Sequence, residues 1–386
     1  MRRDVFLLSA AAFASSASLR ATDPLLPLIA EDFGVTPGAA ATAATAFALA
    51  YGLLQVIYGP LGDRYGRYRM IAATAFASAF CSAACAIAPD LPSLVVARFV
   101  SGATIGAFIP LSVAWIGDTF AYAQRQSLLA RYLIGQIVGI GFGTALSGWL
   151  AEQFGWRAIF GLLAAVLLVL ALFLTIEARH QPVPAARSSM LQSFARMPRL
   201  LRRWALTSII ATAFGEGFFI FGALAFVALY FQRRFGVGPG TAGSLVALYA
   251  LGGMMYAAVA PRALRRFGEL GLATIGGVTL AIGYATLAAS AWLPLAAAGL
   301  VAIGGGFYMF HTTVQTKLTE VEQKERGSAV ALFATFLFTG QASGLWVASH
   351  VVDAGGTAPV FWFSAAGLAV MTLAFRKRLL SSRRAP

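Results

Sequence analysis

Long apolar runs recur along the whole sequence, and they constrain the fold more than any other feature. A helix needs roughly 20 mostly apolar residues to cross about 30 Å of hydrocarbon. Because the runs lack strand-like alternation, they predict helices, whose backbone hydrogen bonds close internally. With 59% apolar and 11% charged residues, the chain is excluded from the soluble class. We predict an all-α membrane protein with twelve transmembrane helices, near 5–30, 39–61, 70–88, 93–117, 127–150, 157–177, 204–231, 240–261, 270–290, 294–317, 328–350 and 358–375.

The basic residues gather on one side of the predicted membrane. They cluster at the N-terminus, between the second and third spans, in residues 178–203 and after residue 375. The positive-inside rule makes that side cytoplasmic, so both termini are expected inside an inner, cytoplasmic membrane. The net charge of +14 then reflects topology and contact with anionic lipid in the bilayer, and no nucleic-acid partner is expected.

The N-terminus has an alternative interpretation. Residues 1–21 combine a basic start, an apolar run and small residues, as a cleavable signal does. Asp4 is unfavourable in such a signal, and the repeat described next requires this segment as its first helix.

An internal repeat divides the chain. The octet FGVTPGAA at 33–40 returns as FGVGPGTA at 235–242, and GQIVG at 135–139 matches GQASG at 340–344. Each half then holds six spans in the same orientation, which is a parallel repeat about an axis along the membrane normal. We predict an N-terminal half at 1–177, a cytoplasmic linker at 178–203, a C-terminal half at 204–376 and a cytoplasmic tail at 377–386.

The loop GPLGDRYGRYR at 59–69 resembles the signature of the major facilitator superfamily between its second and third helices. RFVSGATIGA at 98–107 and GWRAIF at 155–160 resemble its fourth and sixth helices, and DPLLP from Asp23 resembles its drug and metabolite:proton antiporters. One departure weakens the antiport assignment: Thr144 follows Gly143 where those antiporters usually have a proline.

The resemblance implies alternating access between the two halves, with the first, fourth, seventh and tenth helices lining the cavity. It also implies a conformational latch in the signature loop, in which Asp63 faces the start of the eleventh span near 326–328 and Arg67 reaches Asp118. The latch residues are Gly59, Asp63, Arg64, Gly66, Arg67 and Asp118. The small-residue stripe Gly135, Gly139, Gly143 and Ser147 is expected to face the other half.

Charged side chains inside the predicted spans are functional candidates, because burying them in a bilayer costs several kcal/mol. Asp23 and Arg20 lie in the first span, and Arg98 lies at a similar depth in the fourth. Asp23 is either a static brace paired with Arg20 or Arg98, or a carboxylate that exchanges a proton against substrate with the help of Arg98.

Glu216 lies close to the middle of the seventh span, and no basic residue follows in that helix before Arg233. It either carries a proton or is a neutral acid hydrogen-bonded to a neighbouring helix. Its counterpart in the first half is Ala14, and the counterpart of Asp23 is Ala225. This asymmetry favours a role in substrate or proton binding for both acids.

Aromatic and polar residues near these acids suggest a substrate cavity. Aromatic rings around one acid suit an amphipathic, cationic ligand. The candidates are Arg20, Phe218, Phe219, Tyr308, His311 and Gln315, of which His311 and Gln315 could instead make an interhelical hydrogen bond.

The sequence thus predicts a proton-coupled exporter of small amphipathic molecules that acts as a monomer, driven by a proton gradient without a cofactor. A metabolite or sugar exporter and an uptake symporter are alternatives. A membrane enzyme or a non-transporting receptor is a remote one, since no nucleophile with an adjacent base, metal cluster or phosphate loop is found.

Overall fold

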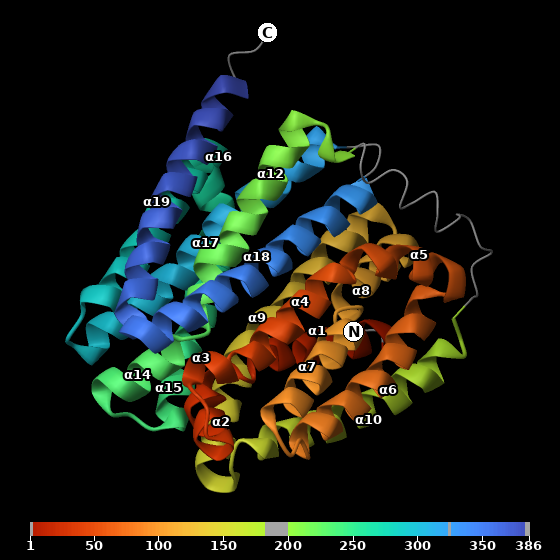
Figure 1. Ribbon diagram of the computed structural model, residues 1–386. Helices are drawn as coiled ribbons and strands as arrows, with labels where there is room; N and C mark the ends of the chain where they lie inside the picture. The colour runs from red at the N-terminus through yellow and green to blue at the C-terminus, as the bar shows by residue number, and fades with distance from the viewer. Residues whose placement is uncertain (1–2, 182–199, 323–325, 383–386) are drawn as a thin grey trace.

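The computed structural model describes residues 3–181, 200–322 and 326–382, and every element in these ranges is a helix (Figure 1). The predicted linker at 178–203 falls largely outside the described residues. The last helix continues to Ser382, so the predicted tail from residue 377 begins as helix.

The N-terminal half contains the first six spans. Its elements are α1 (Arg3–Arg20), the 3-10 turn η1 (Asp23–Leu25), α2 (Leu26–Phe33), α3 (Pro37–Ala40), α4 (Thr42–Leu53), α5 (Gln55–Tyr65), α6 (Arg67–Ala86), α7 (Leu91–Ile105), α8 (Phe108–Thr119), α9 (Tyr122–Phe154) and α10 (Arg157–Ala178).

The C-terminal half contains the other six. Its elements are α12 (Trp204–Gly215), the π-helical turn η2 (Glu216–Phe221), α13 (Gly222–Leu224), α14 (Val227–Phe235), α15 (Pro239–Val246), α16 (Leu248–Ala289), α17 (Leu293–Val321), α18 (Arg326–Gly355) and α19 (Thr357–Ser382).

The helices reproduce the twelve predicted spans. In the described residues, ten helices are long and apolar enough to cross a membrane, and the pair 37–53 and 55–65, bent by 51°, forms an eleventh. The segment Pro239–Ala289 is 51 residues long and contains two of the predicted spans. They join at Gly268, whose φ of 62° interrupts the helix. The chain is a multi-pass membrane protein with the predicted all-α fold.

The two halves meet along two equivalent seams. The α18 helix packs along α4 and α5 of the first half, and α9 packs on α15 and α16 of the second. These are the second and eleventh spans, and the fifth and eighth, so the sequence repeat relates one seam to the other. The remaining large contacts, such as α1 with α9 and α16 with α17, lie within one half.

The signature loop is shorter than predicted. Gly59 and Gly62 lie inside α5, which continues through Pro60 to Tyr65. Only Gly66 turns the chain, with a φ of 92°. Gly62 instead allows close packing, because a Cβ there would lie 2.5 Å from Leu111 Cδ2 of α8.

The predicted orientation of the glycine stripe on α9 is wrong. A Cβ on Gly139 would lie 2.5 Å from Phe13 O, and one on Gly143 would lie 2.6 Å from Ala17 Cα, so the stripe packs on α1 of the same half. The other half is met by a second small-residue face, which includes Gly141 and Gly148. A helix of small residues can approach neighbours on two sides, and spacing by four does not decide which neighbour each side meets.

Candidate functional site

Glu216 and His311 form a buried pair between the seventh and tenth spans. His311 Nδ1 lies 3.0 Å from Glu216 Oε2, and the Glu216 side chain has no exposure to solvent. Although no basic residue follows Glu216 in its own helix before Arg233, a neighbouring helix supplies this partner. His311 lies on another helix, 95 residues along the chain, so the sequence pattern within the Glu216 helix does not identify it as the partner.

The local backbone around Glu216 is unusual. Glu216 opens the π-helical turn η2, and such turns inside α-helices occur frequently at functional sites. The turn is pressed against α18, where a Cβ on Gly217 would lie 2.7 Å from Gln341 N. The second carboxyl oxygen, Oε1, is buried and has no hydrogen-bond partner among the described residues. An acceptor is thus available for a proton or a donor group from a ligand.

Arg20 and Asp23 form a second buried pair at a break in the first span. Arg20 Nη1 lies 3.3 Å from Asp23 Oδ2, and both side chains are 2% exposed. The helix stops at Arg20, and the turn η1, which contains Pro24, separates it from α2. A broken helix inside a membrane exposes unpaired backbone groups, and in transporters it commonly marks a binding site.

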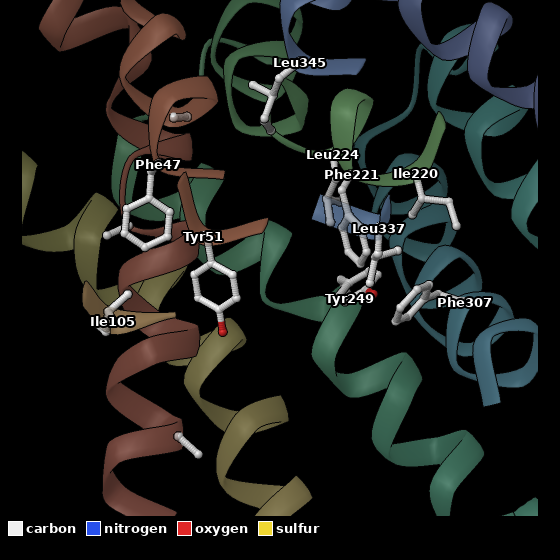
Figure 2. Packing of buried hydrophobic residues seen from close by; sticks show 14 of the residues in the cluster. Phe47, Tyr51, Ile105, Ile220, Phe221, Leu224, Tyr249, Phe307, Leu337 and Leu345 are labelled. Atoms are coloured by element: carbon white, nitrogen blue, oxygen red, sulfur yellow. The ribbon is translucent and has the colours of Figure 1, made fainter. Parts of the chain in front are cut away.

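An aromatic cluster connects the two pairs across the boundary between the halves. The Arg20 guanidinium lies 4.7 Å from the centre of the Phe221 ring. Phe221 and Phe307 are 4.9 Å apart, and Phe307 stacks on His311 at 4.8 Å. Figure 2 shows Phe221, Tyr249 and Phe307 gathered together in the C-terminal half, with Phe47 and Tyr51 on the other side.

Tyr308, a candidate from the sequence, belongs to this aromatic cluster, with its ring 5.0 Å from that of Phe307 and 6.2 Å from that of Tyr249. The hydroxyl of Tyr249 is buried without a hydrogen-bond partner among the described residues. Tyr249 was not among the sequence candidates, because a tyrosine in an apolar run resembles any other core aromatic.

Arg98 is buried but separate from the acids in its hydrogen bonding. Its Nη2 donates to Ser18 O at 3.2 Å, and its guanidinium lies 3.9 Å from the centre of the Phe47 ring. The sequence left Arg20 and Arg98 open as partners of Asp23. In the structure Asp23 pairs with Arg20.

Three other cavity candidates lie elsewhere. Phe218 and Phe219 contact each other at 5.1 Å, and Phe219 lies 5.5 Å from Phe363 of α19. Their described ring contacts lead away from Glu216 and His311. Gln315 is exposed, and no contact with His311 is described for it. Phe218 and Phe219 lie on the π-helical turn η2, where consecutive side chains point to different neighbours than α-helical spacing predicts.

The signature loop forms a compact ion-pair network in the first half. Arg67 Nη2 lies 2.9 Å from Asp63 Oδ1, and Arg67 Nη1 lies 2.6 Å from Asp118 Oδ2 of α8. The Arg67–Asp118 contact is the one predicted. Arg64 lies over the ring of Tyr65 at 5.3 Å. The side chain of Arg326 is outside the described residues, so docking of Asp63 on α18 stays a prediction.

The Glu216–His311 pair contains groups that can exchange a proton. An acid and an imidazole that share one proton are together neutral, and they become charged when the pair gains or loses a proton. Charge in a buried site is costly unless a counter-charge arrives with it. Groups of three or more His, Cys, Asp or Glu side chains that could hold a metal ion are not found among the described residues.

Comparisons with known proteins agree with the fold. A sequence profile described as Major Facilitator Superfamily matches residues 8–321. The chain is 24% identical over 176 residues to an uncharacterised MFS-type transporter of Bacillus subtilis, covering 46% of this chain and 44% of the relative. It is 30% identical over 208 residues to the multi-drug resistance efflux pump PmrA of Streptococcus pneumoniae, covering 51% and 52%. The matched region thus spans about half the length of these relatives.

Among solved structures, the crystal structure of the POT family transporter PepTSo superposes with a TM-score of 0.82. The match covers 100% of this chain and 99% of the other, at 13% sequence identity. At this identity the likeness concerns the fold alone.

Proposed function

Because the chain belongs to the Major Facilitator Superfamily, we propose that it is a secondary transporter that exports small amphipathic molecules in exchange for protons across a cytoplasmic membrane. The observation that carries this proposal is the buried Glu216–His311 pair, with its hydrogen bond of 3.0 Å and its unpartnered carboxyl oxygen. The resemblance to an efflux pump over half the chain supports the direction of transport.

Competition for one buried site couples the proton to the substrate. When the Glu216–His311 pair holds one shared proton, it is neutral and stable in the apolar interior. A cationic substrate favours the anionic form of the pair, because it supplies the missing positive charge. Binding of substrate therefore releases the proton, and binding of a proton from the other side of the membrane displaces the substrate.

The surroundings suit an amphipathic cation. The rings of Phe221, Phe307 and Tyr308 form an apolar, aromatic wall beside His311. Aromatic faces attract cations by about 0.5–2 kcal/mol, depending on solvent access. The Arg20 charge is balanced by Asp23 in the same region, so it does not add a net positive charge against such a substrate.

Proteoliposomes test this function. The purified protein is reconstituted, a pH gradient is imposed, and accumulation is measured for a panel of ethidium, other lipophilic cations, neutral amphiphiles and sugars. We expect accumulation of the cations that collapses when the gradient is dissipated. We expect Glu216→Gln to abolish gradient-driven accumulation while exchange of internal for external ethidium persists, because the amide keeps the shape but cannot release a proton.

Asp63→Asn serves as the matched control, since it also removes one carboxylate but lies at the signature loop, away from the site. It should slow gradient-driven accumulation without abolishing it. Accumulation of sugars in place of cations would support the metabolite-exporter alternative. Undiminished accumulation by Glu216→Gln would remove this acid from the coupling step.

A further inference from the structure

The repeated octet occupies equivalent places in the two halves. Residues 33–40 end α2 and form α3, and residues 235–242 end α14 and begin α15. These elements lie together at one end of the bundle, far from the C-terminus (Figure 1). We call this end, which carries the turns at Gly34 and Gly236, the outer end, and the end with the turns at Gly66 and Gly268 the inner end.

At the outer end, α18 contacts the first copy of the octet. Asp353 Oδ2 accepts a hydrogen bond from Thr36 Oγ1 at 2.6 Å, and its Oδ1 accepts one from the amide of Gly38 at 2.9 Å. Asp353 belongs to the second half and the octet to the first. The carboxylate therefore joins the halves at the end of one seam.

At the other seam, α9 makes the equivalent contact with the second copy. Glu152 Oε1 accepts a hydrogen bond from the amide of Gly240 at 2.8 Å. Gly240 corresponds to Gly38 in the octet, and Glu152 lies at the end of α9 as Asp353 lies at the end of α18. The repeat thus produces the same carboxylate-to-amide contact twice.

The two glycines are required by the closeness of these contacts. A Cβ on Gly38 would collide with the Asp353 carboxyl group and lie 2.5 Å from Ser349 O. A Cβ on Gly240 would lie 2.7 Å from Glu152 Oε2 and 3.2 Å from Trp149 Cα. The glycine present in both copies of the octet follows from this geometry, since each glycine lies against the opposite half.

The inner end differs. Its ion pairs Arg67–Asp118 and Lys317–Glu269 each join residues of one half, at 2.6 Å in both cases. Among the described residues, these inner-end ion pairs stabilise each half separately, whereas Asp353 and Glu152 at the outer end connect the halves.

We propose that Asp353 and Glu152 are a matched pair of latches that hold the outer end closed, and that their release permits the outer end to open. A hydrogen bond from an amide to a charged carboxylate is stronger than one to a neutral group. Each latch stabilises the closed arrangement, and its hydrogen bonds are lost when the seam separates. This inference requires neither the proposed substrate nor proton coupling.

Distance measurements between spin labels test the latches. In a background with Cys81→Ala and Cys85→Ala, one label pair reports the outer end (Ile87→Cys and Ala291→Cys). A second pair reports the inner end (Tyr65→Cys and Phe267→Cys), and all four positions are exposed. The labelled protein is studied in lipid nanodiscs without substrate. The variant that combines Glu152→Ala with Asp353→Ala should gain a population with longer outer distances and shorter inner distances.

The expected size of the population change follows from the usual contribution of an exposed carboxylate at the start of a helix. Each single variant should change the ratio of outer-open to outer-closed protein by about 2- to 5-fold, and the double variant by about 4- to 25-fold. Gly38→Ala and Gly240→Ala should act in the same direction without removing a charge, because the added methyl group pushes the halves apart.

Asp32→Ala is the matched control. Asp32 is also a carboxylate at the outer end, but it pairs with Arg157 of the same half at 2.5 Å. We expect its distance distributions to equal those of the unsubstituted protein. Unchanged distributions in the double variant and both glycine variants would overturn the proposal. Longer outer distances without shorter inner ones would overturn it as well, because they would indicate local fraying.

Discussion

At the scale of single residues, the sequence identifies the buried charged side chains. It gives little information about which residues they pair with. Asp23, Arg98 and Glu216 are visible because a charge inside an apolar run is costly and therefore conspicuous. The pairing of Glu216 with His311 depends on how the seventh and tenth spans pack, and no pattern within either span encodes it. The spacing of three residues between Arg20 and Asp23 was compatible with their pairing, but the sequence left Arg98 as an alternative partner.

The Arg20–Asp23 pair provides a test that separates a brace from a coupling group. Asp23→Asn should destabilise the protein by about 3–5 kcal/mol, because it leaves the buried Arg20 charge unpaired. The variant with both Arg20→Met and Asp23→Leu should recover most of this loss, because neither charge remains. Thermal unfolding in detergent measures the stability, and gradient-driven ethidium accumulation measures function.

The two interpretations differ in the double variant. A static brace predicts that it transports nearly normally, since the apolar pair fills the same space. A role in proton exchange predicts that it folds but no longer couples transport to the pH gradient. Full stability of Asp23→Asn would contradict the description of Arg20 as a buried cation that depends on Asp23.

At the scale of helices, hydrophobic length predicts the spans and proline or glycine predicts some of their breaks. Pro24 precedes the start of α2, and Gly268 separates two spans that hydropathy also separates. The π-helical turn at Glu216 was not predicted, because the sequence does not show that the glycines in η2 and α13 lie against α18. The orientation of the α9 stripe failed for the same reason: contacts between helices decide it.

Glycine substitutions in the first half test the packing of α9. Gly139→Ala should cost about 1–3 kcal/mol, because the new Cβ would lie 2.5 Å from Phe13 O of the α1 backbone. Gly161→Ala in α10 is the control, since nothing lies within 4 Å of its Cβ position. It should be neutral or stabilise the protein by about 0.5–1 kcal/mol through higher helix propensity. Thermal unfolding of both variants in the same detergent checks this, and equal stabilities would contradict the tight α1–α9 contact.

At the scale of the whole molecule, the repeat predicts two halves but not which state they adopt. The repeated octet and the even number of spans are sufficient for the arrangement in Figure 1. In our proposal the state depends on a few contacts between the halves, such as the hydrogen bond from Gly38 to Asp353. A sequence pattern does not rank such small differences.

The topology is testable independently of the state. The basic segments predict that the end with Arg67 and Arg179 faces the cytoplasm. A single cysteine at His180, which is exposed, should be protected from an impermeant maleimide in intact cells and become labelled after permeabilisation. A cysteine at Trp292, also exposed, should show the opposite pattern. Labelling of residue 180 in intact cells would invert the assignment of inner and outer ends.

The last prediction concerns the balance between states. The signature loop holds Asp63 beside Arg67, which also pairs with Asp118, within one half, while Asp353 and Glu152 join the halves at the outer end. If Asp63 engages the start of α18 when the inner end closes, Asp63→Asn weakens only the inner-closed state. The population then shifts further toward the arrangement described here, without a change in the site itself. We therefore expect turnover to fall about tenfold, the equivalent of about 1.4 kcal/mol, with ethidium affinity within a few-fold of the unsubstituted protein. Combining Asp63→Asn with Glu152→Ala should restore part of the turnover, because the second change weakens the opposite state. Normal turnover in Asp63→Asn alone would leave the signature loop with a role in folding or topology only.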